Sequence, residues 1–386
     1  MTALDPLALA QALIRRPSVT PKDEGALAVL EAALKPLGFT CHRLVFGASD
    51  RTENLYARVG TGAPLFCFAG HTDVVPPGDA KLWRDDPFAA AIRDGVLYGR
   101  GAADMKSAVA AFTAAASRHL ANGPLKGSIA LLITGDEEGD ALNGTCKVLD
   151  WLAAKGEKLD HCIVGEPSSI SAVGDTLKIG RRGSLNVRAT VSGTQGHVAY
   201  PLKALNPIPA AAELVTKLTS LKLDDGTAHF EPSTLVFTSL DVGNPATNVI
   251  PAEARVMFNI RFNDRHGPDS LLKLLENVAA AVAMDTACTI TLEHALSGVA
   301  FALEPGPFTA LIAEAVESVT GKAPAFSTGG GTSDARFIKD TCPVAELGLV
   351  NATMHKANEC VALADIERLT QIYTALLDSY FKNPPK

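Results

Sequence analysis

The segment PLFCFAG (64–70) is a short, almost wholly apolar run with polar residues directly after it. Two similar runs follow along the chain, SIALLIT (128–134) and CIVG (162–165). They are too short for typical helices, and their uniform apolar character is typical of strands covered on both faces of a sheet. Helical patterns lie between them, at residues 105–120 and 143–155. This alternation predicts an α/β fold with a mostly parallel central sheet.

The middle of the chain has a different pattern. Segments such as RRGSLNVRATVSG (181–193) and EARVMFNIRF (253–262) alternate apolar and polar residues, as half-exposed strands do. About four such strands and two helical segments make a compact α+β unit, after which long helices and buried strands return. We therefore expect a catalytic domain formed by residues 1–180 and 296–386, with a second domain inserted at 181–295.

The composition excludes several classes of protein. Of the 386 residues, 47% are apolar and 20% charged, which is typical of a folded chain. The net charge of −7, with scattered basic residues, argues against a nucleic-acid partner. No apolar run is long enough to span a membrane, and residues 1–18 do not resemble a signal peptide. Seven cysteines without CxxC spacing are typical of reduced thiols, so we expect a cytoplasmic protein with no membrane partner.

Side chains able to bind a metal ion follow each of the buried strands. These are His71, Asp73, Asp136, Glu137, Glu138 and Glu166, joined by Asp104 at the start of a helix and His355 after the last buried strand. Each alone is also typical of a turn, a helix N-terminus or a solvated loop. Because ligands bind beyond the carboxyl ends of strands in open α/β sheets, we expect these side chains to converge. Two imidazoles and several carboxylates at one edge then require a cation.

The residue types favour Zn²⁺, Mn²⁺ or Co²⁺, because mixed histidine and carboxylate sites suit these ions. His71, Asp104 and Glu166 could hold one ion. His355 and Glu138 could hold a second ion, with Asp104 shared between the two.

Three acidic residues, Asp73, Asp136 and Glu137, are left without a ligand role, and the positions of Asp73 and Glu137 suggest other roles. Asp73 lies two residues after His71 and could orient its imidazole from the far nitrogen. Glu137 adjoins Glu138 and could face the attacking water as a general base.

The motifs that carry these residues resemble the M20 metallopeptidases over nearly the whole chain. They are GHTDVVPPGD, YGRGAADMKSAVAA, LLITGDEEG, VGEPS, RRGSL, GTQGHVAYP, GGTSDARF and NATMHKANE. The resemblance implies a zinc-exopeptidase-like catalytic domain, two Zn²⁺ ions per subunit with Co²⁺ able to replace one, and a homodimer formed through the inserted domain. VGEPS, RRGSL, GGTSDARF and NATMHKANE favour those members that hydrolyse N-succinyl-L,L-2,6-diaminopimelate to succinate and L,L-2,6-diaminopimelate.

The resemblance also implies roles for individual residues. It gives the same five metal ligands, with Glu137 as general base and Asp73 as the orienting carboxylate. It implies a cis peptide bond at Asp104–Met105. His197 would act from the partner subunit as a donor to the developing oxyanion, and Asn248 would be a second substrate-site residue from that subunit.

The implied substrate carries three carboxylates, so its site needs fixed cations. Arg181 and Arg261 are candidates for bidentate carboxylate binding, although surface salt bridges would explain both arginines as well. The glycines of STGGGTSD would let main-chain amides approach a carboxylate, whereas a nucleotide-phosphate loop is disfavoured because no GK[ST] follows. Other candidates, in segments similar to the family's substrate-contacting loops, are Ser184, Tyr200, Gly330, Gly331, Thr332 and Asn351.

Three alternatives stay open at this point. Another M20 amidohydrolase, such as an acetylornithine deacetylase or an aminoacylase, shares the general motifs. A non-catalytic metal-binding or ligand-binding relative is disfavoured because a binder has no need of a general base at Glu137. A monomeric M20 peptidase would leave His197 with no partner subunit to serve.

Overall fold

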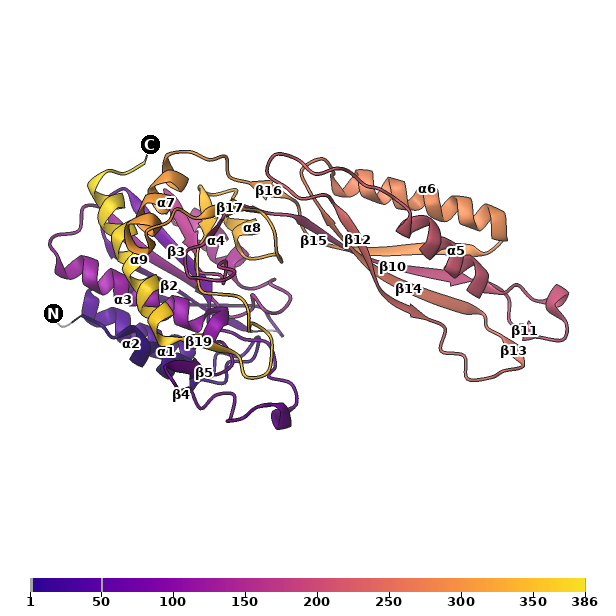
Figure 1. Cartoon of the computed structure of the whole chain (residues 1–386), viewed down its shortest axis with the longest axis horizontal. Helices are drawn as coiled ribbons and strands as arrows, with labels where there is room; N and C mark the ends of the chain where they lie inside the picture. The colour runs from indigo at the N-terminus through magenta and orange to yellow at the C-terminus, as the bar shows by residue number, and fades with distance from the viewer. Residues whose placement is uncertain (1–2, 50, 386) are drawn as a thin grey trace. The chain divides into compact units, whose positions relative to one another are not determined.

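The computed structural model describes residues 3–49 and 51–385, which divide into two compact units (Figure 1). Unit 1 runs up to Ile179 and includes Leu303–Ser327 and the chain from Ser333 onward. Unit 2 comprises Gly180–Ala302 and Thr328–Thr332. The division expected at residue 295 falls inside strand β15, which belongs to unit 2.

Unit 1 is built on an eight-stranded sheet of order β1-β2-β6-β3-β7-β18-β8-β17. The strands are β1 (Thr40–Phe46), β2 (Thr52–Gly60), β3 (Leu65–His71), β6 (Ser128–Thr134), β7 (His161–Val164), β8 (Thr176–Lys178), β17 (Ala325–Ser327) and β18 (Val344–Glu346). β3 runs parallel to β6 and β7, and β18 runs parallel to β7. Every residue of β3 and β6 is buried, so the predicted parallel centre of the sheet is confirmed. β1 and β2 add an antiparallel edge that the sequence analysis did not assign.

Helices cover this sheet. They are α1 (Pro6–Ile14), α2 (Ala26–Leu34), α3 (Ser107–Ala121), α4 (Thr145–Ala154), α7 (Pro307–Thr320), α8 (Ala335–Ile338) and α9 (Leu363–Lys382). α3 packs against both α9 and α1, and α7 packs on α9 (Figure 1). Between sheet and helices lies an aromatic core in which Phe68 stacks on Phe112 at 4.4 Å and Tyr373 meets Phe112 edge-on at 5.6 Å. A small sheet of β4 (Ala91–Arg93), β5 (Val96–Tyr98) and β19 (Cys360–Ala362) completes the unit.

The start of α3 differs from the sequence prediction. The apolar pattern begins at Met105, but the helix begins at Ser107 because Asp104 and Met105 have non-helical backbone angles. The Asp104–Met105 peptide bond is cis, as the resemblance implied.

Unit 2 contains a four-stranded antiparallel sheet of order β12-β14-β10-β15. Its strands are β10 (Gly183–Ser192), β12 (Thr234–Asp241), β14 (Glu253–Phe262) and β15 (Thr289–Gly298). Helices α5 (Pro207–Thr219) and α6 (Pro268–Thr286) lie on one face of it (Figure 1). Alternate residues of β14 are buried, which matches the alternation seen in the sequence. Two short pairs complete the unit, β9 (Gly180–Arg181) with β16 (Phe301–Ala302), and β11 (Gly196–His197) with β13 (Val249–Ile250).

All seven cysteines are free thiols. Within residues 3–49 and 51–385, none of the helices has both the length and the apolar character needed to span a bilayer.

Candidate metal centre

The carboxyl ends of neighbouring strands in unit 1 bring the predicted ligand residues together. His71 is the last residue of β3, and Glu138 follows the neighbouring strand β6. Glu166 lies just beyond β7, and His355 lies in the loop after β18. Asp104 comes from the turn that precedes α3. Five side chains from five chain segments thus meet at one edge of the sheet, as parallel strands dictate.

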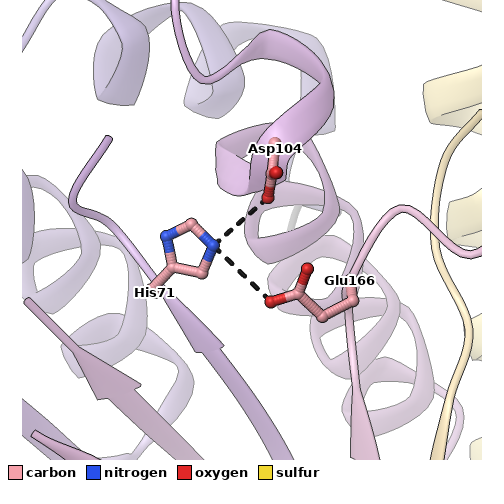
Figure 2. A group of neighbouring side chains, drawn as sticks. All are labelled: His71, Asp104 and Glu166. Atoms are coloured by element: carbon pink, nitrogen blue, oxygen red, sulfur yellow. Dashed lines mark hydrogen bonds and ion pairs between the residues drawn. The ribbon is translucent and has the colours of Figure 1, made fainter. Parts of the chain in front are cut away.

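The first ligand group is His71, Asp104 and Glu166 (Figure 2). His71 Nε2 lies 3.2 Å from Asp104 Oδ1 and 3.6 Å from Glu166 Oε1. All three residues are buried. Glu166 Oε1 is buried and accepts no hydrogen bond from the described residues, so this oxygen is available to a cation.

The second group is Asp104, Glu138 and His355. His355 Nε2 lies 2.9 Å from Glu138 Oε1 and 3.3 Å from Asp104 Oδ2. Asp104 therefore presents a different carboxylate oxygen to each histidine. The His355 side chain is 47% exposed, so this group is open to solvent whereas the first is enclosed.

The donor atoms fit a pair of small divalent cations. Nitrogen and carboxylate ligands lie about 2.0–2.2 Å from Zn²⁺, and two ligands of one tetrahedral ion then lie about 3.3 Å apart. The distances in the two groups, 2.9 to 3.6 Å, centre on this value. A carboxylate with one oxygen in each group is the arrangement that allows a shared ligand.

Burial and mutual repulsion make this cluster electrostatically unfavourable without a cation. Burial raises the pKa of Glu137 and Glu166 well above the usual range, and neighbouring carboxylates add to the rise. Burial also opposes ionisation of Asp104, but hydrogen bonds with the two histidines outweigh it and lower its pKa. Hydrogen bonds with Asp104 and Glu138 raise the pKa of His355 to about 10. A metal ion would replace the protons that the ligands Glu166 and His355 otherwise retain.

Asp73 contacts one residue of each ligand group, His71 and Glu138. The atom that binds His71 is not the predicted carboxylate. The hydrogen-bond partner of His71 Nδ1 is the main-chain oxygen of Asp73 at 2.9 Å, while the Asp73 carboxylate lies 3.6 Å away. A carbonyl oxygen can only accept, so Nδ1 carries the proton and Nε2 faces the ligand group. The carboxylate instead accepts a hydrogen bond from the main-chain amide of Glu138 at 3.1 Å. Burial raises the pKa of Asp73 to about 7.

Glu137 belongs to neither ligand group of the described residues. Its Oε2 lies 3.9 Å from His71 Nε2, which places a carboxylate beside the ligands without making it one of them. Asp334, to which the sequence analysis gave no role, is buried and contributes to the raised pKa of Glu137. Its carboxylate accepts a hydrogen bond from Thr145 Oγ1 at 2.6 Å. The nearby Asp136 instead binds the main-chain amide of Asn143 at 2.8 Å, a contact that shapes the loop.

Three of the residues assigned through the resemblance lie together in unit 2. His197 pairs with Val249 across β11 and β13, next to Asn248. The ring of Tyr200 lies 5.9 Å from that of His197. His197 Nδ1 accepts a hydrogen bond from the Ala199 amide at 3.0 Å. The neutral imidazole therefore carries its proton on Nε2, and the exposed side chain can donate from that atom.

The candidate substrate arginines also belong to unit 2. Ser184 and Arg261 are direct partners across β10 and β14. Arg261 Nη1 is buried and has no hydrogen-bond partner among the described residues, while burial and the neighbouring arginines lower the Arg261 pKa. Arg181 donates from Nη1 to the main-chain oxygen of Gly331 at 2.8 Å. Gly330 and Thr332 flank that carbonyl in unit 2, and Asn351 lies in unit 1, where its amide binds Ser169 O.

Comparisons with known proteins agree with this architecture. The model of peptidase family M20/M25/M40 matches residues 67–379. The chain is 58% identical to a succinyl-diaminopimelate desuccinylase of Maricaulis maris over 381 residues, covering 99% of this chain and 97% of the relative. A second desuccinylase, from Rhodospirillum centenum, is also 58% identical, with 98% of each chain covered. An M20 family metallo-carboxypeptidase from Sulfolobus solfataricus shares the fold, with a TM-score of 0.81, 18% identity, and 98% and 100% of the two chains covered. The chain therefore belongs to peptidase family M20/M25/M40.

Proposed function

We propose that this protein hydrolyses the amide bond of N-succinyl-L,L-2,6-diaminopimelate, releasing succinate and L,L-2,6-diaminopimelate for lysine and diaminopimelate biosynthesis. The observation that carries the proposal is the paired ligand set of unit 1 with a carboxylate, Glu137, beside it. The names of relatives that are 58% identical over nearly the whole chain support the substrate.

The proposed cofactor is a pair of Zn²⁺ ions per subunit, with Co²⁺ able to replace one of them. His71 and Glu166 would bind one ion, Glu138 and His355 the other, and Asp104 would contribute one oxygen to each. When bound, the ions would polarise the scissile carbonyl and lower the pKa of a water molecule toward neutrality.

The chain's own residues supply the proton transfers. Glu137 accepts the proton of the attacking water and returns it to the nitrogen of the leaving amine. Burial and neighbouring carboxylates raise the pKa of Glu137, which makes its carboxylate a stronger proton acceptor than that of an exposed glutamate. Asp73 holds His71 through its main-chain oxygen and the Glu138 segment through its carboxylate.

Residues of unit 2 would bind the substrate and stabilise the oxyanion. We propose that the unit is a dimerisation domain and that His197 of the partner subunit donates from Nε2 to the developing oxyanion, with Asn248 beside it. Arg181 and Arg261 would pair with substrate carboxylates, and the unsatisfied Arg261 Nη1 is consistent with that role. Further substrate contacts from unit 2 would come from Ser184, Tyr200, Gly330, Gly331 and Thr332, and Asn351 would add a contact from unit 1. The free thiols fit a reducing compartment, so a cytoplasmic location stays our prediction.

A comparison of the rates at which the protein hydrolyses three candidate substrates tests the proposal. Zinc-loaded protein is assayed with N-succinyl-L,L-2,6-diaminopimelate, N-acetylornithine and an N-acetyl amino acid. The highest kcat/KM is expected for the succinyl substrate. A higher kcat/KM for an acetylated substrate would overturn the substrate assignment. If protein that contains two ions hydrolyses none of the three substrates, the proposed enzymatic function is overturned.

A further inference from the structure

Another buried carboxylate, that of Glu359, contacts the turn that carries Asp104. This residue is in the loop between β18 and β19, and its side chain is fully buried. Its Oε1 accepts hydrogen bonds from the main-chain amides of Ala103 at 2.8 Å and Asp104 at 3.0 Å. Its Oε2 accepts from the amide of Gly101 at 3.1 Å and from Arg100 Nη1 at 2.6 Å. One carboxylate thus receives four hydrogen bonds from four residues of the segment 100–104.

The turn that carries Asp104 is shaped around this carboxylate. Gly101 has a φ of +86°, a left-handed conformation that lets nearby amides point to one side and form an anion-binding concavity. A side chain there would meet Val74 Cγ1 at 2.8 Å. Packing next to Gly101 and the hydrogen bonds to Glu359 therefore both restrict the turn.

Arg100 offsets the charge of Glu359. Both side chains are almost completely buried, and the guanidinium also lies 5.3 Å from the ring centroid of Trp83. The ion pair lets a carboxylate sit beside the metal ligands without adding net negative charge to the centre. Glu359 itself belongs to neither ligand group of the described residues.

The same loop supplies His355. Asn358 holds this loop in place, because its side chain accepts a hydrogen bond from the Arg84 amide and donates one to Leu82 O, both at 2.8 Å. Glu359 therefore joins the segment that carries one histidine of the centre to the turn that carries the shared carboxylate.

We propose that Glu359 is a positioning residue for the metal centre proposed above. By holding the main-chain amide of Asp104, it keeps the Asp104 carboxylate where one oxygen faces His71 and the other faces His355. The inference rests on the proposed function for the identity of the centre, but its test does not depend on turnover.

The test compares Co²⁺ binding by the parent, Glu359→Gln and Glu359→Asp, all prepared free of metal. Glutamine turns an amide group toward main-chain donors, and aspartate is too short to reach both Ala103 and Asp104. Calorimetry gives the affinity for each ion, and the visible absorption of bound Co²⁺ reports its coordination. The control is Glu157→Gln, which removes a half-buried carboxylate bonded to Arg58 and to Tyr56 Oη elsewhere in unit 1.

Both Glu359 variants should bind at least one Co²⁺ about 10–100-fold more weakly than the parent, with a changed absorption spectrum. The control should bind Co²⁺ like the parent. Thermal unfolding of the metal-free proteins distinguishes a specific loss of Co²⁺ affinity from a general loss of stability. Parent-like affinities and spectra in a folded Glu359 variant would overturn the inference, as would failure of both variants to fold. Failure of the parent to bind two ions would instead overturn the proposed centre.

Discussion

Glu137 and Glu138 are adjacent in the chain, yet their surroundings predict opposite effects of the same substitution. Glu138 Oε1 lies 2.9 Å from His355 Nε2 and belongs to the second ligand group. Glu137 Oε2 lies 3.9 Å from His71 Nε2 and belongs to neither group of the described residues. Glutamine keeps the shape of either side chain and removes its charge. Glu137→Gln should therefore retain both ions and lose turnover, whereas Glu138→Gln should lose affinity for one ion.

The expected magnitudes follow from these roles. A positioned general base contributes about 10²–10⁴-fold to rate, which corresponds to about 2.7–5.4 kcal/mol of activation free energy for Glu137→Gln. Loss of a residue that only orients a ligand costs about 10–100-fold in metal affinity, so loss of the ligand Glu138 should cost at least that. Because burial makes the charged form of Glu137 costly, its replacement by glutamine should not destabilise the metal-free protein.

Three measurements on the same preparations check this prediction. Elemental analysis gives the number of ions per chain, calorimetry gives their affinities, and steady-state kinetics at saturating zinc gives kcat and KM. Near-parent kcat in Glu137→Gln would refute its assignment as general base. Loss of an ion from Glu137→Gln, or unchanged affinities in Glu138→Gln, would refute the division of roles between the two residues.

Other predictions address protonation, the partner subunit and the core. Because the pKa of His355 is raised to about 10, ion binding must displace a proton. The affinity for the Zn²⁺ ion that His355 binds should then rise about tenfold per pH unit from pH 6 to 8 on account of this one proton. Calorimetry in several buffers would measure the protons released, and an affinity for that ion independent of pH would contradict the prediction. Mixed dimers of Glu137→Ala and His197→Ala subunits should regain one working site, and activity no higher than in either variant alone would contradict the partner-subunit role. Phe112→Ala, which removes the ring stacked on Phe68, should lower the unfolding free energy by about 3–5 kcal/mol in denaturant titrations; a loss below about 1 kcal/mol would contradict its place in the core.

Hydrophobic pattern identified the parts of the fold that are buried on both sides. PLFCFAG and SIALLIT became β3 and β6, because a strand in the middle of a covered sheet has no polar face. β1 was missed since its residues are half-exposed at the sheet edge and include Cys41, His42 and Arg43. The start of α3 was placed too early for a related reason: Met105 is buried, and an apolar pattern reports burial rather than backbone conformation.

The convergence of the candidate ligands could be inferred because their side-chain chemistry is visible in the sequence and strand direction fixes where they meet. Contacts made through the main chain carry no such signal. His71 is held by a carbonyl oxygen, which any residue at position 73 would supply, so the sequence pointed to the carboxylate of Asp73 instead. That carboxylate holds the amide of Glu138, which again has no residue-specific signature.

The role of Glu359 could not be predicted from the sequence for the same reason, because its contacts are mostly with main-chain amides. A glutamate four residues after a histidine in a polar loop is typical of a solvated surface, and 255 positions separate it from the amide of Asp104 that it binds. The amides of Gly101, Ala103 and Asp104 become a binding site only when the turn adopts its non-helical conformation, and that conformation depends on the packing around Gly101. Side chains that contact a metal ion or substrate can therefore be inferred from type and spacing, whereas side chains that position them through the main chain emerge only once the fold has brought the two segments together.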